Sequence, residues 1–244
     1  MGVIYQSRQQ IQQRIHAACI AAGRQPQDVK LLLATKTVEP SQIIEALESG
    51  LNYIGENKVQ ELKRKHPFLK QQHIAFHFIG HLQTNKVKDV LSVADCIQSV
   101  DRLHLAIALD KQLQKEGRSM DVLLQVNTSY EASKFGVSPE EALNLAKQVA
   151  ALDTLNVKGL MTIGLFSAEQ EKVRRCFQLL AQLKNDIAAA GLPHIQMQEL
   201  SMGMSGDFET AIREGATMVR VGTSIFGQRM YPDSYYWNEQ SHQN

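Results

Sequence analysis

The fold is decided by the run Leu31-Leu32-Leu33-Ala34-Thr35-Lys36, in which an unbroken apolar stretch ends in a threonine and a lysine. A short apolar run bounded by polar residues is typical of a strand buried on both faces of a parallel sheet. A lysine at the end of such a strand is unusual, because an unpaired ammonium is costly to bury. The run therefore predicts a central parallel strand that ends in a partly desolvated amine.

Lys36 has two readings on position alone. A partly desolvated lysine has a lowered pKa and a usable neutral amine, which is what covalent bonding to an aldehyde requires. Alternatively, its side chain extends from the strand end to water and has no chemical role.

Similar apolar runs alternate with amphipathic helical segments along the whole chain. The predicted strands cover about 29–35, 53–55, 75–79, 96–100, 121–126, 157–161, 195–200 and 218–221. The predicted helices cover about 3–22, 40–47, 59–69, 87–91, 103–116, 138–149, 167–187 and 206–214. Eight strand–helix units indicate parallel strands joined by right-handed crossovers. Without a Gly-rich dinucleotide fingerprint after the first strand, they favour a closed barrel over an open sheet.

We therefore predict an α/β protein, a single (β/α)8 TIM barrel with an extra N-terminal helix over residues 1–230. Residues 231–244 form a polar tail with several aromatic residues. Polar residues are predicted to cap three helices: Asp101, Ser138 together with Glu141, and Ser167 together with Gln170.

Composition excludes several functional classes. With a net charge of +1 over 244 residues, nothing suggests a nucleic-acid partner. The N-terminus lacks a secretory signal, and no apolar run is long enough to span a membrane. Cys19, Cys96 and Cys176 form no CxxC motif, so we expect free thiols in a reducing cytoplasm. No His or Cys spacing predicts a metal site.

Polar residues follow five of the predicted strands. In a barrel of this kind, ligands bind at the C-terminal ends of the strands. Side chains far apart in the sequence are therefore expected to meet at one rim. These candidates are Lys36, Asn57, His81, Ser201, Gly222 and Thr223.

Two glycine-rich turns, 200–207 and 219–227, follow the seventh and eighth strands. Barrels often bind phosphate at these turns, where small residues let backbone N–H groups face the ligand. The alternative is two tight turns that need glycine for positive φ. Arg220 lies within the apolar eighth strand, where a guanidinium needs a partner. That partner is either an acidic residue of the barrel or a ring nitrogen or carboxylate of a ligand. Asn57 either contacts a ligand or caps a helix.

At these motifs the chain resembles the pyridoxal phosphate homeostasis proteins. The resemblance covers about Lys30 to Arg229 and rests on a set of short motifs. They are Ala34-Thr35-Lys36-Thr37, Ile54-Gly55-Glu56-Asn57, residues 77–83, Asn85-Lys86, Gln125-Val126-Asn127, Ser133-Lys134-Phe135-Gly136, residues 159–163, residues 201–207 and residues 219–227.

The resemblance implies a fold-type III barrel similar to the N-terminal domain of alanine racemase. It also implies that pyridoxal 5′-phosphate (PLP) binds covalently at Lys36 as a Schiff base. The cofactor-binding residues would be Lys36, Asn57, His81, Ser201, Met202, Gly203, Arg220, Gly222 and Thr223. Of these, Ser201, Gly222 and Thr223 would hold the phosphate, with backbone help near Met202 and Gly203.

The arginine has a chemical consequence. Arg220 would face the pyridine nitrogen, as the resemblance implies, and an arginine donates a hydrogen bond there but cannot accept a proton. The ring is then a weak electron sink. Racemases of this kind add a β-rich domain that completes the site with a tyrosine, and the stretch after residue 230 is too short for one. We therefore expect a monomeric cytoplasmic carrier without catalytic residues, acting in PLP and amino-acid homeostasis.

Its expected partners are PLP and PLP-accepting apoenzymes, with no nucleic acid or membrane. Two alternatives stay open: a small PLP-dependent enzyme such as an amino-acid racemase, and a barrel that binds another phosphorylated metabolite with Lys36 as a point charge. Lys134, in a Ser-Lys-Phe-Gly turn, is a further candidate for a role in cofactor transfer.

Overall fold

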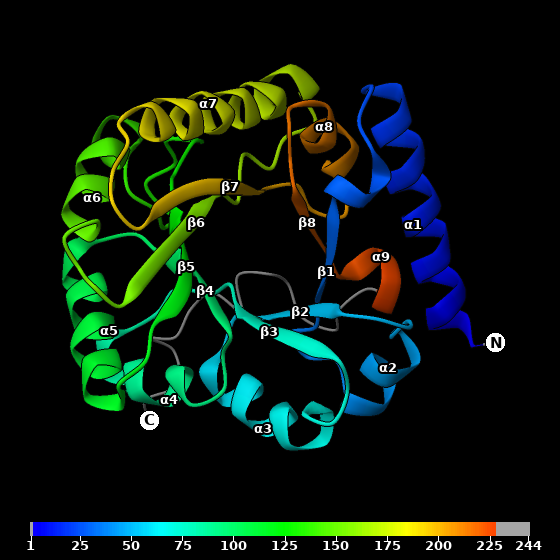
Figure 1. Cartoon of the computed structure of the whole chain (residues 1–244). Helices are drawn as coiled ribbons and strands as arrows, with labels where there is room; N and C mark the ends of the chain where they lie inside the picture. The colour runs from blue at the N-terminus through cyan, green and yellow to red at the C-terminus, as the bar shows by residue number, and fades with distance from the viewer. Residues whose placement is uncertain (1, 228–244) are drawn as a thin grey trace.

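Eight parallel strands close into a barrel surrounded by helices (Figure 1). The structure, a computed structural model, describes residues 2–227. The strands are β1 (Lys30–Ala34), β2 (Asn52–Glu56), β3 (Ile74–Phe78), β4 (Cys96–Val100), β5 (Met120–Gln125), β6 (Leu155–Met161), β7 (Ile195–Ser201) and β8 (Met218–Val221). Each pairs with the next, and β8 pairs with β1. The predicted closed barrel is confirmed.

Helices cover the outside of this barrel (Figure 1). They are α1 (Val3–Ala21), α2 (Pro40–Glu45), α3 (Val59–Leu69), α4 (Val87–Leu91), α5 (Leu103–Glu116), α6 (Ala142–Val149), α7 (Gln170–Ala189), α8 (Phe208–Arg213) and α9 (Thr223–Phe226). Three 3-10 turns, η1 (Pro26–Asp28), η2 (Thr84–Lys86) and η3 (Pro139–Glu141), complete the described part. The extra helix α1 packs against α8 and α9, with Ile11, Ile15 and Cys19 buried. The sequence did not predict α9.

Most apolar side chains lie between the strands and the helices. Leu32, Ile79 and Met218 form a separate small cluster, packed against Ala34 and Tyr53. Gly55 makes room for it, because a Cβ there would lie 2.4 Å from a Leu32 methyl carbon. Other buried side chains on the strands are polar, and several of them belong to the candidate site.

The strand register places β1 between β2 and β8, which both lead to candidate residues. Leu32 pairs with Arg220 of β8, and Leu33 pairs with both Val221 of β8 and Ile54 of β2. The turn after β1 therefore lies beside the ends of β2 and β8.

Two of the predicted helix caps are wrong because the side chains are used elsewhere. Arg102, and not Asp101, stands at the N-cap of α5, while the Asp101 carboxylate accepts a 2.6 Å hydrogen bond from Arg102 Nη1. Glu169 stands at the N-cap of α7, and Ser167 Oγ instead accepts from Glu169 N at 3.1 Å.

The predicted capping box at Ser138 is also wrong. A proline directly after Ser138 begins the 3-10 turn η3, and α6 starts only after it, at Ala142. The Ser138 side chain makes no cap hydrogen bond.

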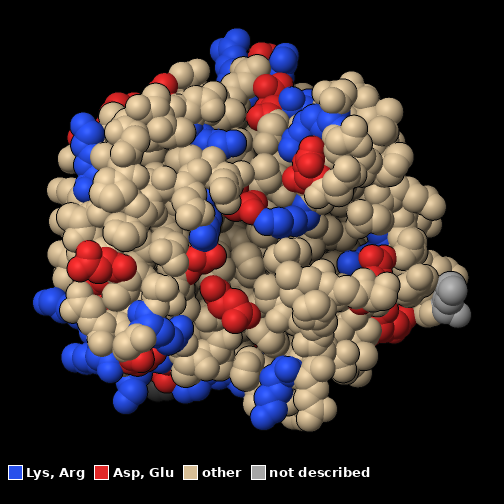
Figure 2. All heavy atoms as spheres, in the orientation of Figure 1, with Lys and Arg blue, Asp and Glu red and all other residues tan. Residues whose placement is uncertain are grey.

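Surface charge is mixed. Figure 2 shows basic and acidic side chains interspersed over the face drawn there, including around its centre. At the start of β1, Lys30 forms an ion pair with Glu199 of β7, whose other oxygen accepts from Thr217 Oγ1 at 2.6 Å. Within residues 2–227, no helix has the length and hydropathy needed to cross a membrane. The predicted tail, 231–244, lies outside the described residues.

Candidate functional site

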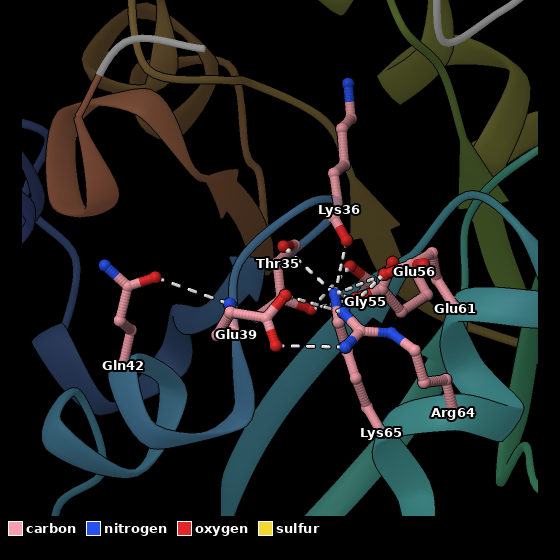
Figure 3. A network of polar contacts seen from close by, with 9 residues as sticks. All are labelled: Thr35, Lys36, Glu39, Gln42, Gly55, Glu56, Glu61, Arg64 and Lys65. Carbon is pink, nitrogen blue, oxygen red and sulfur yellow. Dashed lines mark hydrogen bonds and ion pairs between the residues drawn. The ribbon is translucent and has the colours of Figure 1, made fainter. Parts of the chain in front are cut away.

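Lys36 lies on the turn directly after β1 and is 9% exposed. Its φ is +23°, in the left-handed region that residues with a side chain rarely adopt. Figure 3 shows its side chain pointing away from a polar network beneath the turn. A strained backbone at a lysine on the barrel rim is the kind of feature that clusters at functional sites.

The network beneath Lys36 is built on a buried ion pair. Lys65 Nζ of α3 lies 2.6 Å from Glu56 Oε1 at the end of β2, and neither side chain is exposed (Figure 3). Thr35 Oγ1 donates to the same carboxylate oxygen at 2.5 Å. Burial raises the pKa of Glu56 to about 7, although the Lys65 charge and the Thr35 hydroxyl oppose that rise.

Arg220 is buried between strands β7 and β1, and the acceptors that its guanidinium contacts within residues 2–227 are neutral. Nη1 donates to Ser201 Oγ at 2.8 Å, and Nη2 donates to the Thr162 carbonyl at 2.6 Å. Burial lowers the pKa of Arg220 to about 10, although the charge of Asp207 opposes this shift. Within residues 2–227 no carboxylate forms an ion pair with Arg220, so the predicted alternative of an ion pair within the barrel is absent there.

A directional chain of hydrogen bonds continues from Arg220 across the barrel. Ser201 Oγ donates to Gln98 Oε1 at 2.6 Å, and Gln98 Nε2 lies 2.7 Å from His77 Nδ1. Since an amide nitrogen only donates, Nδ1 accepts and the imidazole proton is on Nε2. Burial lowers the pKa of His77 to about 4, which keeps the ring neutral. His77 is therefore a core residue.

This chain of hydrogen bonds fixes the position of Ser201, which was predicted to bind phosphate. Its hydroxyl is fully buried, gives its proton to Gln98 and accepts from Arg220. The backbone N–H of the next residue, Met202, donates to Met218 O at 3.1 Å and closes the barrel between β7 and β8. Both groups thus already have partners inside the barrel.

The two glycine turns meet at the rim, as expected. Gly222 lies against the end of β1, since a Cβ there would be 2.7 Å from the Ala34 carbonyl oxygen. Its N–H donates to Ser205 Oγ at 3.4 Å. Gly203 has a φ of +90°, and a Cβ there would be 2.5 Å from the Cβ of Ala211. These approaches leave no space for larger residues.

Ser205 lies at the same turn and was not among the candidate residues that the sequence predicted. Its hydroxyl is half-buried and is the one side-chain oxygen recorded at the Gly222 amide within residues 2–227. The sequence did hold a signal, because Ser205 lies within the glycine-rich turn 200–207. The direction of its hydroxyl group could not be predicted from that motif. Thr223 begins α9 directly after Gly222 and is exposed.

The remaining predicted residues lie across the rim, on the β2 and β3 side. Asn57 is buried, and Gly80 packs so closely on it that a Cβ there would be 2.1 Å from Asn57 O. Lys58, and not Asn57, is the N-cap of α3, so the capping alternative is excluded. His81 stacks on Phe135, with ring centroids 3.8 Å apart.

His81 also faces an acidic group. Its Nδ1 lies 3.7 Å from Asp101 Oδ2. Burial alone would raise the pKa of Asp101, but the nearby His81 and the charge of Arg102 hold it below its usual value. The rim therefore carries a histidine–carboxylate pair in addition to Lys36.

Lys134, the further candidate, lies on the loop between β5 and η3. Its Nζ donates to the Gly164 carbonyl at 2.6 Å and forms an ion pair with Glu131. Metal binding has no support in the described residues, where no cluster of three His, Cys, Asp or Glu is suitably placed. The three cysteines are free and buried.

Comparisons with known proteins agree with this geometry. The family model for the alanine racemase N-terminal domain matches residues 8–230. A pyridoxal phosphate homeostasis protein from Aquifex aeolicus is 44% identical over 222 residues, covering 90% of this chain and 95% of that protein. Among solved structures, PipY of Synechococcus elongatus PCC7942 with PLP bound is 30% identical with a TM-score of 0.76, covering 89% of this chain and all of PipY (100%).

A more distant structure shows the fold alone. Alanine racemase from Clostridium difficile 630 is 13% identical with a TM-score of 0.67. The match covers 91% of this chain but only 57% of the racemase chain.

Proposed function

This chain belongs to the pyridoxal phosphate homeostasis proteins, whose barrel is that of the alanine racemase N-terminal domain, and from this premise we propose that it binds PLP covalently through Lys36. Its role is to hold the cofactor for PLP and amino-acid homeostasis. The observation that carries the proposal is the convergence of three features at one rim: a lysine with a strained backbone, a glycine turn against the end of β1, and a buried arginine without a carboxylate partner among residues 2–227.

The donors at this rim fit such a group. PLP brings a phosphate anion, an aldehyde and a ring nitrogen with a lone pair. Lys36 offers an amine, and Arg220 offers a buried cation that lacks a charged partner among the described residues. The turns at Gly203 and Gly222 bring backbone close to the strand ends without side chains in the way.

We assign the phosphate to the hydroxyls of Ser205 and Thr223 and to the backbone at Gly222. Ser205 already lies at the Gly222 amide, and Thr223 is the adjacent exposed residue. Ser201 supports the site by a different route than the one predicted, because its hydroxyl holds Arg220 in place. Met202 and Gly203 shape the turn 200–207. The Gly203 carbonyl accepts a hydrogen bond from Arg220 N at 2.9 Å.

Arg220 would face the ring nitrogen, with Asn57 near the ring and His81 at its edge. When bound, the cofactor supplies an aldehyde carbon for the lysine and an electron-withdrawing ring. Arg220 would donate a hydrogen bond to the nitrogen and could not accept one from it. Its pKa of about 10 keeps it charged at neutral pH, so the ring nitrogen stays unprotonated. This arrangement favours retention of the cofactor over stabilisation of a carbanion.

Spectroscopy with peptide mapping tests the covalent site. Purified protein incubated with PLP should gain visible absorption, and borohydride reduction should fix one cofactor on the peptide that contains Lys36. Lys36→Ala should lose the label on that peptide, whereas the surface variant Lys63→Ala should keep it. A protein that stays colourless and unlabelled in excess PLP would overturn the proposal, and a noncovalent complex would leave Lys36 as the point charge of the other alternative.

An amino-acid racemase is the second candidate, favoured by the racemase-like fold and by the His81–Asp101 pair on the rim. An enzyme of this kind needs a group that removes the Cα proton. Incubating PLP-loaded protein with L- and D-alanine in D₂O distinguishes a racemase from a carrier. We expect no exchange at Cα above the rate of free PLP, and enzyme-like exchange would establish the racemase.

For partners, we propose that PLP-requiring apoenzymes receive the cofactor and that the carrier is a cytoplasmic monomer. Mixing loaded protein with a PLP-dependent apoenzyme should restore the activity of the apoenzyme, and light scattering should give the mass of one chain. In that assay Lys134→Ala should slow the transfer if Lys134 takes part in it. An unchanged rate would remove Lys134 from the transfer step.

A further inference from the structure

Lys65 is a fully buried cation on a helix whose other basic residues are at the surface. Its neighbours Lys63 and Arg64 pair with Asp89 and Glu39 and are 49% and 42% exposed. Lys65 has no exposed side-chain surface. Lysine is among the residues least often fully buried, so a specific requirement holds it there.

The charge of Lys65 is matched by two carboxylates. Glu56 Oε1 lies 2.6 Å from Nζ, and Glu61, one helical turn earlier on α3, lies at 3.3 Å. Buried ion pairs are seldom more stable than apolar residues of similar volume, because desolvation offsets their attraction. Stability alone therefore does not account for this pair.

The other partners of Lys65 indicate its purpose. Nζ donates to the Thr35 carbonyl at 3.3 Å and also to the Lys36 carbonyl (Figure 3). These two carbonyls lie on either side of the Lys36 Cα. A single ammonium that binds both restricts the rotation of the two peptide groups about that atom, and Lys36 is the residue with a φ of +23°.

We propose that Lys65 and Glu56 form a positioning clamp, which holds the Lys36 backbone in its left-handed conformation and directs the Lys36 amine to the rim. The clamp deepens the proposed function and rests on it, since Lys36 is the residue proposed to hold PLP. Lys65 supplies the donors, while Glu56 keeps the ammonium in place beneath the turn. Thr35 Oγ1, bonded to the same Glu56 oxygen, ties the strand end to the clamp.

Strained conformations persist only where the surroundings impose them. Without the clamp, the turn after β1 is expected to relax, and the Lys36 side chain is expected to point in a different direction. The amine would then react more slowly at the rim and would hold the cofactor less well. Neither Lys65 nor Glu56 would need to touch the cofactor for this effect.

The experiment uses the double variant Lys65→Met/Glu56→Gln. Removing both charges avoids an uncompensated buried ion, and glutamine retains an acceptor for Thr35 Oγ1. Lys63→Met is the matched control, because it removes an exposed lysine from the same helix. Thermal unfolding and circular dichroism first establish that both variants fold like the wild type.

The first readout needs no cofactor. Trace acetylation of the cofactor-free protein, followed by mass spectrometry of the Lys36 peptide, measures the reactivity of that amine. We expect the double variant to be labelled at Lys36 at least about threefold more slowly than wild type, and Lys63→Met to match wild type. Equal labelling of Lys36 in a folded double variant overturns the clamp.

The second readout separates the clamp from the proposed function. PLP affinity should fall about tenfold in the double variant and stay unchanged in Lys63→Met. If wild type does not bind PLP, the proposed function fails, while the acetylation result still decides whether the clamp exists. If the folded double variant binds PLP as tightly as wild type, the clamp is wrong and the proposed function stands.

Discussion

Arg220 Nη1 lies 2.8 Å from Ser201 Oγ, and that hydroxyl in turn donates to Gln98 at 2.6 Å. The serine nearest the end of β7 is therefore a partner of the buried arginine. The hydroxyl that lies at the Gly222 turn belongs to Ser205, four residues further along the chain.

Ser201→Ala and Ser205→Ala are expected to have different effects. Ser201→Ala leaves a buried guanidinium N–H without an acceptor, which should lower the free energy of unfolding by about 1–3 kcal/mol. Ser205→Ala removes a half-buried hydroxyl with one long contact, and stability should change by less than about 0.5 kcal/mol. PLP affinity should nevertheless fall about tenfold in Ser205→Ala, because a hydrogen bond to a charged group is lost. Urea denaturation and PLP titration measure both quantities; a Ser205→Ala protein with wild-type affinity would remove Ser205 from the site.

Gly222→Ala tests the close approach of the second turn to β1. The added Cβ would lie 2.7 Å from the Ala34 carbonyl oxygen, and backbone atoms on both sides cannot easily move. We expect a loss of about 1–3 kcal/mol in unfolding free energy and weaker PLP binding. Gly206→Ala is the control, because no heavy atom lies within 4 Å of the added Cβ in the other glycine turn. Equal stability of the two variants would show that the approach at Gly222 is not tight.

His77 should make stability depend on pH. Its pKa is about 4 in the folded protein, against 6.5 for an ordinary histidine, because burial disfavours the charged ring. The unfolded chain therefore binds the proton more readily, so stability is present above pH 6.5 and is lost as the pH falls toward 4. Between pH 7 and 5 this group should account for about 2 kcal/mol. His77→Asn keeps an acceptor for Gln98, and its unfolding free energy should fall less than that of wild type between pH 7 and 5, by that amount. If the unfolding free energies of the two proteins depend on pH in the same way, His77 is not the group responsible.

Phe135→Ala tests the His81 side of the rim. Phe135 is 39% exposed and stacks on His81 at 3.8 Å, so its removal should free the imidazole with a stability change below about 1 kcal/mol. PLP should then dissociate faster, as measured by transfer to an apoenzyme present in excess. Phe166→Ala is the control, since Phe166 is 93% exposed. Identical dissociation from both variants would place His81 outside the site.

Much of the fold was predictable because strand and helix periodicities are local. The bounds of β4, β8 and α3 agree with the prediction to the residue, and each is a clear apolar pattern between turn residues. The helix starts at Asp101, Ser138 and Ser167 were predicted less well, because a polar side chain has competing partners that sequence spacing does not reveal.

The candidate site was predictable in its location and less so in its bonding. Parallel strands bring their C-terminal ends to one rim, which is why Arg220 on β8 and the turns after β1 and β8, with Lys36 and Gly222, lie side by side as expected. Lys65 gave no signal, since a lysine on an amphipathic helix ordinarily lies in solvent.

The sequence by itself determined the eightfold alternation, the closure of the barrel, and the rim on which Lys36 lies, because each follows from patterns within a few residues. Only the tertiary structure decided that Lys65 reaches beneath Lys36 and that Ser201 serves Arg220. The first contact joins residues 29 positions apart in the sequence, and the second joins residues 19 positions apart. Both depend on strand register and on the requirement that a buried donor finds an acceptor.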